Sequence, residues 1–325
     1  MNNKNVLILS AGRRVELVKA FKNAQKKLNM QNAKVIAVDI SKYAPALYFA
    51  DNFYLVPRVT DIKYIDTIID IAIKENIDLI VPTIDTELYV LALNKRLIEE
   101  KTNAKVLISD KEIIEICNDK NKTIEFLQQN GFDLPNTLNE DDLKNKAYKF
   151  PLFIKPKDGS SSINTFIIND EKELQFFKEY VKEPIIQERI EGNEYTVDVC
   201  MDFEGNVISI VPRIRIATRS GEISKGKIDK NNHVIEDVKR LMQTLKPIGH
   251  ITVQCFLTKD NVIKYIEINP RFGGGAPMSF YAGANSPEFL LRMLNGEELS
   301  YYEGFQDGLV FSRFDDSILI EEGRE

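Results

Sequence analysis

A short segment near residue 270 combines side chains that could hold a metal ion and a phosphate. It reads Glu267-Ile268-Asn269-Pro270-Arg271 and continues through Phe272 into three glycines, where backbone can approach a ligand closely. In an extended strand Glu267 and Asn269 share one face, about 7 Å apart. Their carboxylate and carboxamide are hard oxygen ligands of the kind that Mg²⁺ takes beside substrate phosphates. Arg271 adds a cation. The alternative interpretation is a strand end with solvated polar side chains.

A predicted hairpin gives this segment a neighbour. The β-type segments 251–257 and 262–269 flank Lys259-Asp260-Asn261. If Asp260-Asn261 forms a two-residue turn, Gln254 lies directly opposite Glu267 and adds an oxygen ligand. A slip of one residue in the register would turn Gln254 away.

A lysine and a polar loop form a second candidate group. Lys155 ends an apolar strand, where an ammonium is costly unless an anion such as a phosphate meets it. The alternative is a lysine that snorkels to the surface. The following loop offers backbone N–H groups and hydroxyls to phosphate oxygens, although such loops are often only turns. Its candidate residues are Gly159, Ser160, Ser161 and Ser162. It lacks the Gly-Lys-Ser/Thr order of a Walker A loop.

A charged connection, 187–194, joins two further strand-like segments. Backbone at Glu188 and Ile190 is a candidate for pairing with a purine edge, and Glu194 for accepting hydrogen bonds from ribose hydroxyls. The alternative is an ordinary solvated connection between strands.

An arginine-rich strand follows. Arg213 and Arg215 share a strand face, and Arg219 and Glu222 lie where the strand gives way to a loop. Clustered arginines can bind carboxylate or phosphate in a bidentate manner, so this group is a candidate substrate site. A solvated sheet face is the alternative.

The N-terminal third must position part of this chemistry. Apolar strands at 6–10, 35–39, 79–82 and 105–108 alternate with helical patterns, which predicts a parallel sheet covered on both faces. Ligands gather at the carboxyl ends of such strands. The turn Gly12-Arg13-Arg14, Asp39 and the stretch Asp85-Thr86-Glu87 all fall there. From Phe150 onward strands and hairpins dominate, so the fold class is α/β followed by α+β.

Composition excludes several classes of protein. A chain of 325 residues with 43% hydrophobic and 28% charged residues is typical of a globular protein with two or three subdomains. A net charge of −6 argues against nucleic-acid binding. Apolar runs are too short to span a membrane, and the N-terminus lacks the features of a signal peptide, so a cytoplasmic location is expected. Three scattered cysteines and two histidines predict neither a disulfide framework nor a zinc site.

The motifs occur in a familiar order. Asp119-Lys120 opens a helix that leads to Gly131 and Leu134-Pro135, and then come the Lys155 strand, the serine loop, the 187–194 connection and the Glu267–Arg271 segment. This order resembles the ATP-grasp superfamily, most closely single-module proteins related to the carbamoyl-phosphate synthase large subunit. The resemblance covers nearly the whole chain. It implies a Rossmann-like pre-ATP-grasp domain at 1–112, a lid subdomain at 113–188 and a C-terminal subdomain with the metal site at 189–325.

The resemblance also implies roles for individual residues. Lys120 and Lys155 match the basic ATP-binding positions, and residues 159–162 match the mobile loop over the phosphates. Glu188 and Ile190 match the adenine-binding connection, and Glu194 matches the ribose-binding acid. Gln254, Glu267 and Asn269 match the metal ligands, for one or two Mg²⁺ ions or for Mn²⁺. Arg271 matches the catalytic arginine at the transferring phosphoryl group. Gln254 departs from the pattern, because many relatives carry an acid there.

The implied reaction is an ATP-dependent ligation of a small-molecule carboxylate, amino-acid-like, to an amine through an acyl phosphate. On this hypothesis Arg215 and Arg219 orient the carboxylate, while Asp85, Glu87 and the 12–14 turn read the second substrate. A homodimer is common for the family. Carbamoyl-phosphate synthesis is not expected, because one synthetase-like module is present and no second phosphorylating half follows.

Three alternatives remain open. A non-catalytic ATP-binding regulator would lack a metal or phosphate residue, and only Gln254 is ambiguous in that respect. A kinase-like ATP-grasp phosphotransferase would need a single substrate besides ATP. A dinucleotide-dependent oxidoreductase is suggested by the N-terminal sheet and Asp39, but the first turn lacks the Gly-x-Gly-x-x-Gly spacing.

Overall fold

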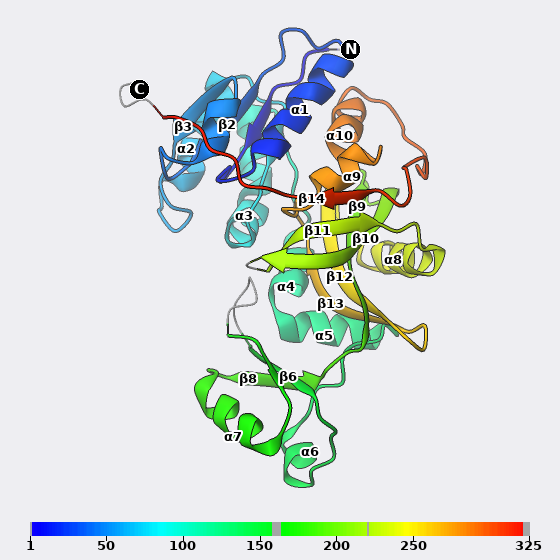
Figure 1. Ribbon diagram of the computed structural model, residues 1–325. Helices are drawn as coiled ribbons and strands as arrows, with labels where there is room; N and C mark the ends of the chain where they lie inside the picture. The colour runs from blue at the N-terminus through cyan, green and yellow to red at the C-terminus, as the bar shows by residue number, and fades with distance from the viewer. Residues whose placement is uncertain (1, 158–163, 220, 321–325) are drawn as a thin grey trace.

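Three sheets organise the computed structural model, which describes residues 2–157, 164–219 and 221–320. A five-stranded parallel sheet lies within residues 6–106, a three-stranded antiparallel sheet within 152–188 and a six-stranded antiparallel sheet within 192–312. The first and third sheets form a main body, and the second lies at the opposite end of the molecule (Figure 1). The predicted combination of α/β and α+β parts is confirmed.

The N-terminal sheet has the strand order β3-β2-β1-β4-β5. Its strands are β1 (Val6–Ile8), β2 (Val35–Asp39), β3 (Asn52–Leu55), β4 (Leu79–Val81) and β5 (Lys105–Val106). The connecting helices are α1 (Val15–Lys27), α2 (Tyr64–Lys74) and α3 (Asp85–Thr102), together with the 3-10 helix η1 (Pro45–Phe49).

Alternation along β1 explains why its residues are all apolar. Val6 and Ile8 pack into a core with Phe21 of α1, while Leu7 and Leu9 pack on the opposite face among residues of α2 and α3. Successive side chains of a strand point to opposite faces, and here helices cover both. The strand order reverses between β1 and β4, so the loops after these two strands flank a topological switch point, the usual ligand crevice of such sheets.

The three-stranded sheet belongs to a small lobe, residues 138–188. It has the order β7-β6-β8 and comprises β6 (Leu152–Pro156), β7 (Phe166–Ile168) and β8 (Pro184–Glu188), with helices α6 (Glu140–Lys144) and α7 (Glu171–Tyr180). The lobe has its own hydrophobic core, which includes Leu138, Ile154 and Leu174.

The six-stranded sheet completes the main body in the order β13-β12-β9-β10-β11-β14. Its strands are β9 (Gly192–Met201), β10 (Val207–Arg219), β11 (Glu222–Ile228), β12 (His250–Thr258), β13 (Ile263–Asn269) and β14 (Val310–Ser312). The helices of this part are α4 (Lys111–Asn118), α5 (Lys120–Gln129), α8 (Asn232–Leu245), α9 (Pro277–Tyr281) and α10 (Ser286–Leu294). After β14 the chain runs back toward the N-terminal sheet (Figure 1).

The structure divides the chain differently from the predicted boundary at residue 113. Leu127 of α5 and Phe132 are buried in the core of the six-stranded sheet, and residues of α4 pack against that core. The core of the small lobe begins only at Leu138. Helices α4 and α5 therefore belong to the main body and not to the lid. The amphipathic pattern of two short helices does not reveal which sheet they cover.

The two parts of the main body share one core. Phe272, Phe280 and Leu290 join the cluster that contains Phe21 of α1. Phe272 also packs edge-on against Phe21, with ring centroids 6.1 Å apart. This packing holds the N-terminal sheet against the segment that follows Arg271. None of the helices within the described part of the chain is long and apolar enough to cross a membrane.

Candidate active site

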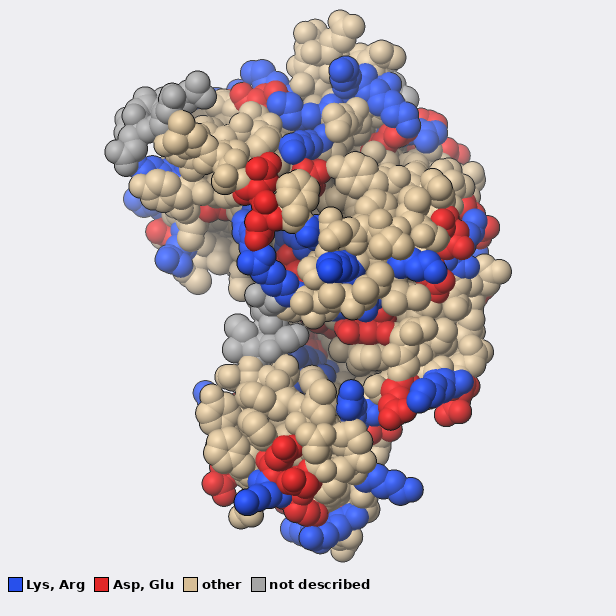
Figure 2. All heavy atoms as spheres, viewed as in Figure 1, with Lys and Arg blue, Asp and Glu red and all other residues tan. Residues whose placement is uncertain are grey.

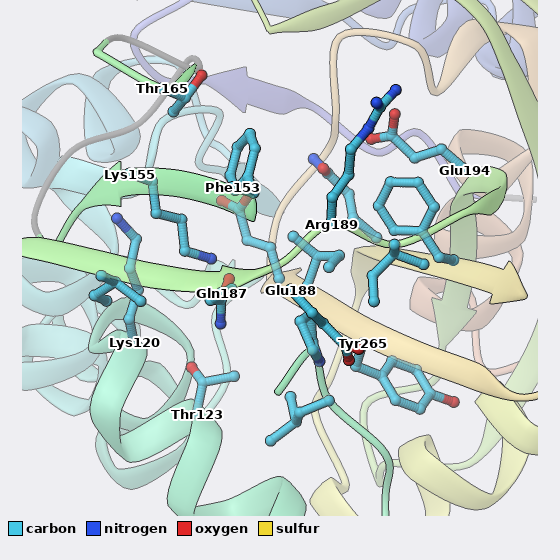
Figure 3. A pocket seen from close by; sticks show the side chains of 18 of the residues that line it. Lys120, Thr123, Phe153, Lys155, Thr165, Gln187, Glu188, Arg189, Glu194 and Tyr265 are labelled. Atoms are coloured by element: carbon cyan, nitrogen blue, oxygen red, sulfur yellow. The ribbon is translucent and has the colours of Figure 1, made fainter. Parts of the chain in front are cut away.

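A cavity of about 790 Å³ lies between the small lobe and the six-stranded sheet. Its volume is in the range of small-molecule and cofactor sites. Figure 2 shows the hollow between the lower lobe and the main body, and Figure 3 shows side chains that line it. The lining includes most of the residues that the sequence singled out: Asp85, Lys120, Lys155, Glu188, Ile190, Glu194, Arg215, Gln254, Glu267 and Asn269. Segments more than 180 residues apart in the chain therefore converge on one site.

Two lysines approach the cavity from different elements. Lys120 begins α5 and donates a hydrogen bond to the carbonyl of Pro156 at 3.1 Å, while Lys155 projects from β6 (Figure 3). Burial, and to a smaller extent the nearby Lys120, lower the pKa of Lys155 to about 8, although Glu267 partly opposes both. Two cations held close together, one of them poorly solvated, favour the arrival of an anion.

The connection between β8 and β9 forms another wall. The carboxylate of Glu188 accepts a hydrogen bond from the backbone of Asn136 at 2.8 Å and is paired with Lys264. This side chain is thus occupied, and the backbone N–H of Glu188 also donates to the carbonyl of Asn136 at 2.9 Å. The backbone carbonyl of Glu188 and the backbone of Ile190 are therefore the groups suited to a base edge. Glu194 lies 3.3 Å from the Arg215 guanidinium, and burial raises the pKa of the Glu194 carboxyl group.

The predicted opposition of Gln254 and Glu267 is confirmed, but the predicted turn was wrong. The two residues are register partners in the β12–β13 ladder. The turn has three residues, Lys259-Asp260-Asn261, because Thr258 donates to the carbonyl of Val262. A β-bulge between Gln254 and Cys255 shifts the register and brings Gln254 opposite Glu267.

Gln254, Glu267 and Asn269 all line the cavity. No group of three or more His, Cys, Asp or Glu side chains that could hold a metal occurs among the described residues. The set offers one carboxylate and two neutral amide oxygens. This donor set suits an Mg²⁺ ion that arrives with nucleotide phosphates, which supply the remaining oxygens and negative charge.

Arg271 is held by the N-terminal domain. Its Nε and Nη2 atoms donate to the two carboxylate oxygens of Asp85 at 2.9 and 2.7 Å. Nη2 also donates to the Oδ1 of Asn269 at 3.2 Å. Asp85 begins α3 directly after β4, so a carboxyl-end residue of the parallel sheet fixes the arginine beside a candidate metal ligand. Such bidentate pairs constrain geometry as well as charge.

The structure corrects the placement of Arg213. This side chain is fully buried and does not line the cavity. It pairs with Asp198 at 2.9 Å, and Asp198 also accepts from Ser279. Burial opposes ionisation of Asp198, but Arg213 and then His250 hold its pKa at about 2. Arg213 is therefore a structural residue, although it shares a strand face with Arg215.

Three other candidates lie outside the cavity. Arg219 is exposed and paired with Asp315 at 2.5 Å. Glu222 interacts with Arg313 at 2.9 Å and with Arg14 at 3.4 Å. Glu87 is buried and accepts from the backbone of Thr83 and Ile84 at the start of α3, which makes it a helix-capping residue and corrects its predicted role with substrate.

The loops of the N-terminal sheet are fixed by similar local contacts. The backbone N–H of Gly12 donates to Asp39 Oδ2 at 2.8 Å, and Ser41 donates to the other oxygen at 2.9 Å. Gly12 has φ +45°, a conformation that glycine adopts without strain. Asp39 thus orients the loop that carries Arg14.

The glycine run after Arg271 makes room for side chains of the protein itself. A Cβ atom on Gly273 would lie 2.7 Å from Thr252, one on Gly274 2.5 Å from the Glu222 carboxylate, and one on Gly275 2.3 Å from the Arg213 guanidinium. The sequence predicted close approach of backbone to a ligand. The structure shows instead that the run accommodates these three polar side chains.

Several cavity residues were not identified from the sequence, among them Thr123, Phe153, Arg189, Thr218 and Tyr265. A signal existed for Phe153, which shares a face of β6 with Lys155 by alternation. Arg189 and Thr218 lie in segments that the sequence singled out, although not as individual residues, and no pattern marked Thr123 or Tyr265. The predicted phosphate loop, Gly159, Ser160, Ser161 and Ser162, lies outside the described residues.

A parallel α/β domain followed by two parts that enclose a nucleotide-sized cavity is the architecture expected of an ATP-grasp protein. Residues 6–107 match the family model described as PylC-like, N-terminal domain, and residues 117–275 match the ATP-grasp domain. The chain therefore carries an ATP-grasp domain after a PylC-like N-terminal domain, which confirms the resemblance seen in the sequence.

Relatives of known activity are carboxylate–amine ligases and related enzymes. The chain is 27% identical over 269 residues to the 3-methyl-D-ornithine–L-lysine ligase of Methanosarcina mazei, a match that spans 81% of this chain and 66% of that ligase. It is 25% identical over 292 residues to a carbamoyl-phosphate synthase of Methanobrevibacter smithii, covering 82% and 78% of the two chains. The structure of N5-carboxyaminoimidazole synthetase from Staphylococcus aureus with ADP aligns with TM-score 0.71 at 20% identity, over 93% of this chain and 80% of that one.

Proposed function

We propose that the protein joins a small-molecule carboxylate to an amine, using ATP and forming an acyl phosphate on the way. One observation carries the proposal: two lysines, the 188–194 connection and the Gln254, Glu267 and Asn269 set line the same cavity. Each group suits a different part of a magnesium nucleotide, and together they would define where its γ-phosphoryl lies.

The chemistry would begin when the substrate carboxylate attacks the γ-phosphoryl of ATP, releasing ADP and leaving an acyl phosphate. The amine then attacks the acyl carbon, an amide bond forms, and phosphate leaves. Glu267 and Asn269 would hold Mg²⁺, which supplies charge neutralisation at the phosphates. Lys155 would contact a phosphate oxygen, and its poorly solvated ammonium interacts more strongly there than in water.

Arg271 would stabilise the charge on the transferring group. It lies within hydrogen-bonding distance of Asn269 and is oriented by Asp85, so little rearrangement is needed when the phosphoryl group moves. Catalysis by fixed donors of this kind depends on such preorganisation. Asp85 is therefore proposed as a positioning residue, in place of the substrate-reading role that the sequence suggested.

A screen for ADP release tests the proposal. Purified protein is incubated with ATP and Mg²⁺, with single amino acids and with amino acids in pairs. Release that requires two partners, with an amide product seen by mass spectrometry, supports ligation. Release with one partner indicates a kinase-like phosphotransferase, and binding of ADP without any release indicates a regulator.

A variant completes this test. In Glu267→Gln the side chain keeps its size but loses its charge, so substrate-dependent ADP release should fall by roughly a hundredfold or more. Wild-type rates in this variant would rule out the metal role of Glu267. Glu100→Gln, an exposed carboxylate on α3, serves as the matched control.

A further inference from the structure

Next to the cavity lies a second group of charged side chains, termed here the arginine cluster. It consists of Arg14, Arg271 and Arg313 with the carboxylates of Asp85 and Glu222. Arg14 follows β1 and Asp85 follows β4, so both lie at the switch point of the parallel sheet. Glu222 begins β11, and Arg313 directly follows β14. Arg271 follows β13, so five separate parts of the fold meet where open α/β sheets usually bind ligands.

The charges of the cluster do not balance. Three guanidinium groups face two carboxylates within the cluster, and both oxygens of Asp85 are already taken by Arg271. Arg13 and Asp315 act on the cluster from its edge and add one charge of each sign. Glu222 is shared: one oxygen lies 2.9 Å from Arg313 and the other 3.4 Å from Arg14. Arg14 is therefore left without a carboxylate of its own within the cluster.

Arg14 is the least satisfied of the three arginines. Its side chain is only 20% exposed, yet among the described residues its one ion pair with a carboxylate is the 3.4 Å contact with Glu222. Burial lowers the pKa of Arg14, Glu222 opposes this, and Arg271 and Arg313 lower it further. A partly desolvated guanidinium with incomplete pairing is stabilised when a carboxylate binds it.

The backbone around the cluster leaves room for the Glu222 carboxylate. Its carboxylate rests against Gly274, where any larger residue would collide with it. The loop bearing Arg14 is fixed by the hydrogen bond from Gly12 to Asp39. The Glu222 carboxylate and the incompletely paired Arg14 guanidinium are therefore complementary to the ammonium and the carboxylate of a zwitterion.

We infer that this cluster binds an α-amino acid as one of the two substrates of the proposed ligation. Arg14 binds the amino acid's carboxylate, and Glu222 accepts a hydrogen bond from its ammonium group. The inference rests on the proposed function for the identity of the reaction, but the binding site itself is defined by the cluster. Arg313 gives the segment after β14 a part in the site, since it holds the second oxygen of Glu222.

Thermal stabilisation in the presence of Mg²⁺ and ADP provides the test. The probes are the twenty common amino acids, their α-amides, which lack the carboxylate, and their deamino acids, which lack the ammonium group. At least one amino acid should stabilise the protein further, its amide should not, and its deamino acid should do so more weakly. Stabilisation by none of the amino acids, or equally by the amide, overturns the inference.

Variants then assign the effect to the cluster. In Arg14→Gln the apparent affinity for the amino acid should fall by roughly ten- to a hundredfold, because a charge-assisted hydrogen bond is lost. Stabilisation by ADP alone should stay as in the wild type, which also shows that the variant folds. Arg14→Lys should recover part of the affinity, and Glu222→Gln should weaken the amino acid more than the deamino acid.

Arg96→Gln is the control, since Arg96 is exposed on α3 and pairs only with Glu100 within the described part of the chain. An Arg14→Gln variant that binds the amino acid as the wild type does overturns the inference. Because ADP release is measured separately, that result leaves the proposed ligation standing. Conversely, amino-acid binding without ADP release contradicts the ligation and not the site.

Discussion

Two arginine–carboxylate pairs in this protein differ in geometry and in surroundings: Arg271 binds Asp85 through two nitrogens, and Arg213 binds Asp198 through one. Arg213 and Asp198 lie 2.9 Å apart and are almost completely buried, with side chains 1% and 2% exposed. Arg271 and Asp85 lie 2.7 Å apart beside the cavity, with side chains 14% and 36% exposed. Water reaches the second pair and is excluded from the first. A contact between the same two kinds of side chain can therefore serve the fold in one place and present a charge to a ligand in another.

The difference arises from what else each pair contacts. Asp198 also accepts from Ser279 and lies 3.5 Å from His250, whose ring stacks on Phe272. The first pair is thus part of a packed network. The Asp85 pair joins two parts of the chain at a rim, where Arg271 also reaches Asn269. A ligand can therefore compete for Arg271 but not for Arg213.

The largest effect is expected when the buried pair is broken. Arg213→Met leaves Asp198 as an uncompensated buried charge and should reduce the free energy of unfolding by about 3–5 kcal/mol. Urea denaturation followed by circular dichroism measures this. Arg219→Met, on the same strand but exposed, should stay within about 0.5 kcal/mol of the wild type. Similar stabilities for the two variants would contradict the assignment of Arg213 to the fold.

Breaking the pair at the cavity should affect catalysis instead. Arg271→Met should reduce kcat for ADP release by roughly 10²–10³-fold, as expected when a preorganised donor is removed. Its unfolding free energy should change by less than about 1 kcal/mol, because Asp85 can be resolvated. A loss of several kcal/mol with unchanged kcat would reverse the two roles.

The glycine that accommodates the buried pair gives a smaller effect. A methyl group in Gly275→Ala would collide with the Arg213 guanidinium, and overpacking of this kind costs about 1–3 kcal/mol. The control is Ala282→Gly, which removes a buried methyl group instead of adding one. Gly296→Ala is unsuitable as a control, because Gly296 has a positive φ and any side chain there would be strained. If Gly275→Ala matches the wild type in urea, the close packing around Arg213 is incorrect.

The smallest effect concerns pH. Lys155 has a pKa of about 8 without nucleotide, so it is charged below that pH and increasingly neutral above it. Affinity for ADP should fall about tenfold between pH 7.5 and 9, and Lys155→Met should remove that dependence. In the absence of nucleotide, pH has the opposite effect on folding stability. The unfolded chain binds more protons between pH 8 and 10.5, so this lysine makes stability rise with pH there.

Isothermal titration calorimetry across this pH range measures the affinity for ADP separately from the folding stability. A wild-type affinity as independent of pH as that of Lys155→Met would show that the ammonium does not contact the phosphates.

Much of the cavity was predictable because its residues belong to short motifs at strand ends. Lys155, Glu194 and Glu267 each line the cavity, and alternation along a strand is enough to place such residues on a face. The same rule could not separate Arg213 from Arg215. They share a face of β10, but the strand passes from the core of the main body to the cavity between them.

Contacts between distant segments were not predictable. Arg271 and Asp85 are 186 residues apart, and Glu222 and Arg14 are 208 apart. Each pair depends on how the N-terminal sheet docks on the six-stranded sheet, which the local pattern of hydrophobic residues does not specify. The same holds for α4 and α5, whose amphipathic faces fit either part of the protein equally well.

The bulge in the β12–β13 hairpin separates its exposed end from the site. On the cavity side, Gln254 is fixed by pairing with Thr196 of β9, and Glu267 is fixed by pairing with Gln254. Changes in the turn at Lys259-Asp260-Asn261 can be absorbed before they reach these residues. This turn is therefore a suitable position for inserting an epitope or a fluorescent reporter, because the spacing of the candidate metal ligands is set by the neighbouring strand.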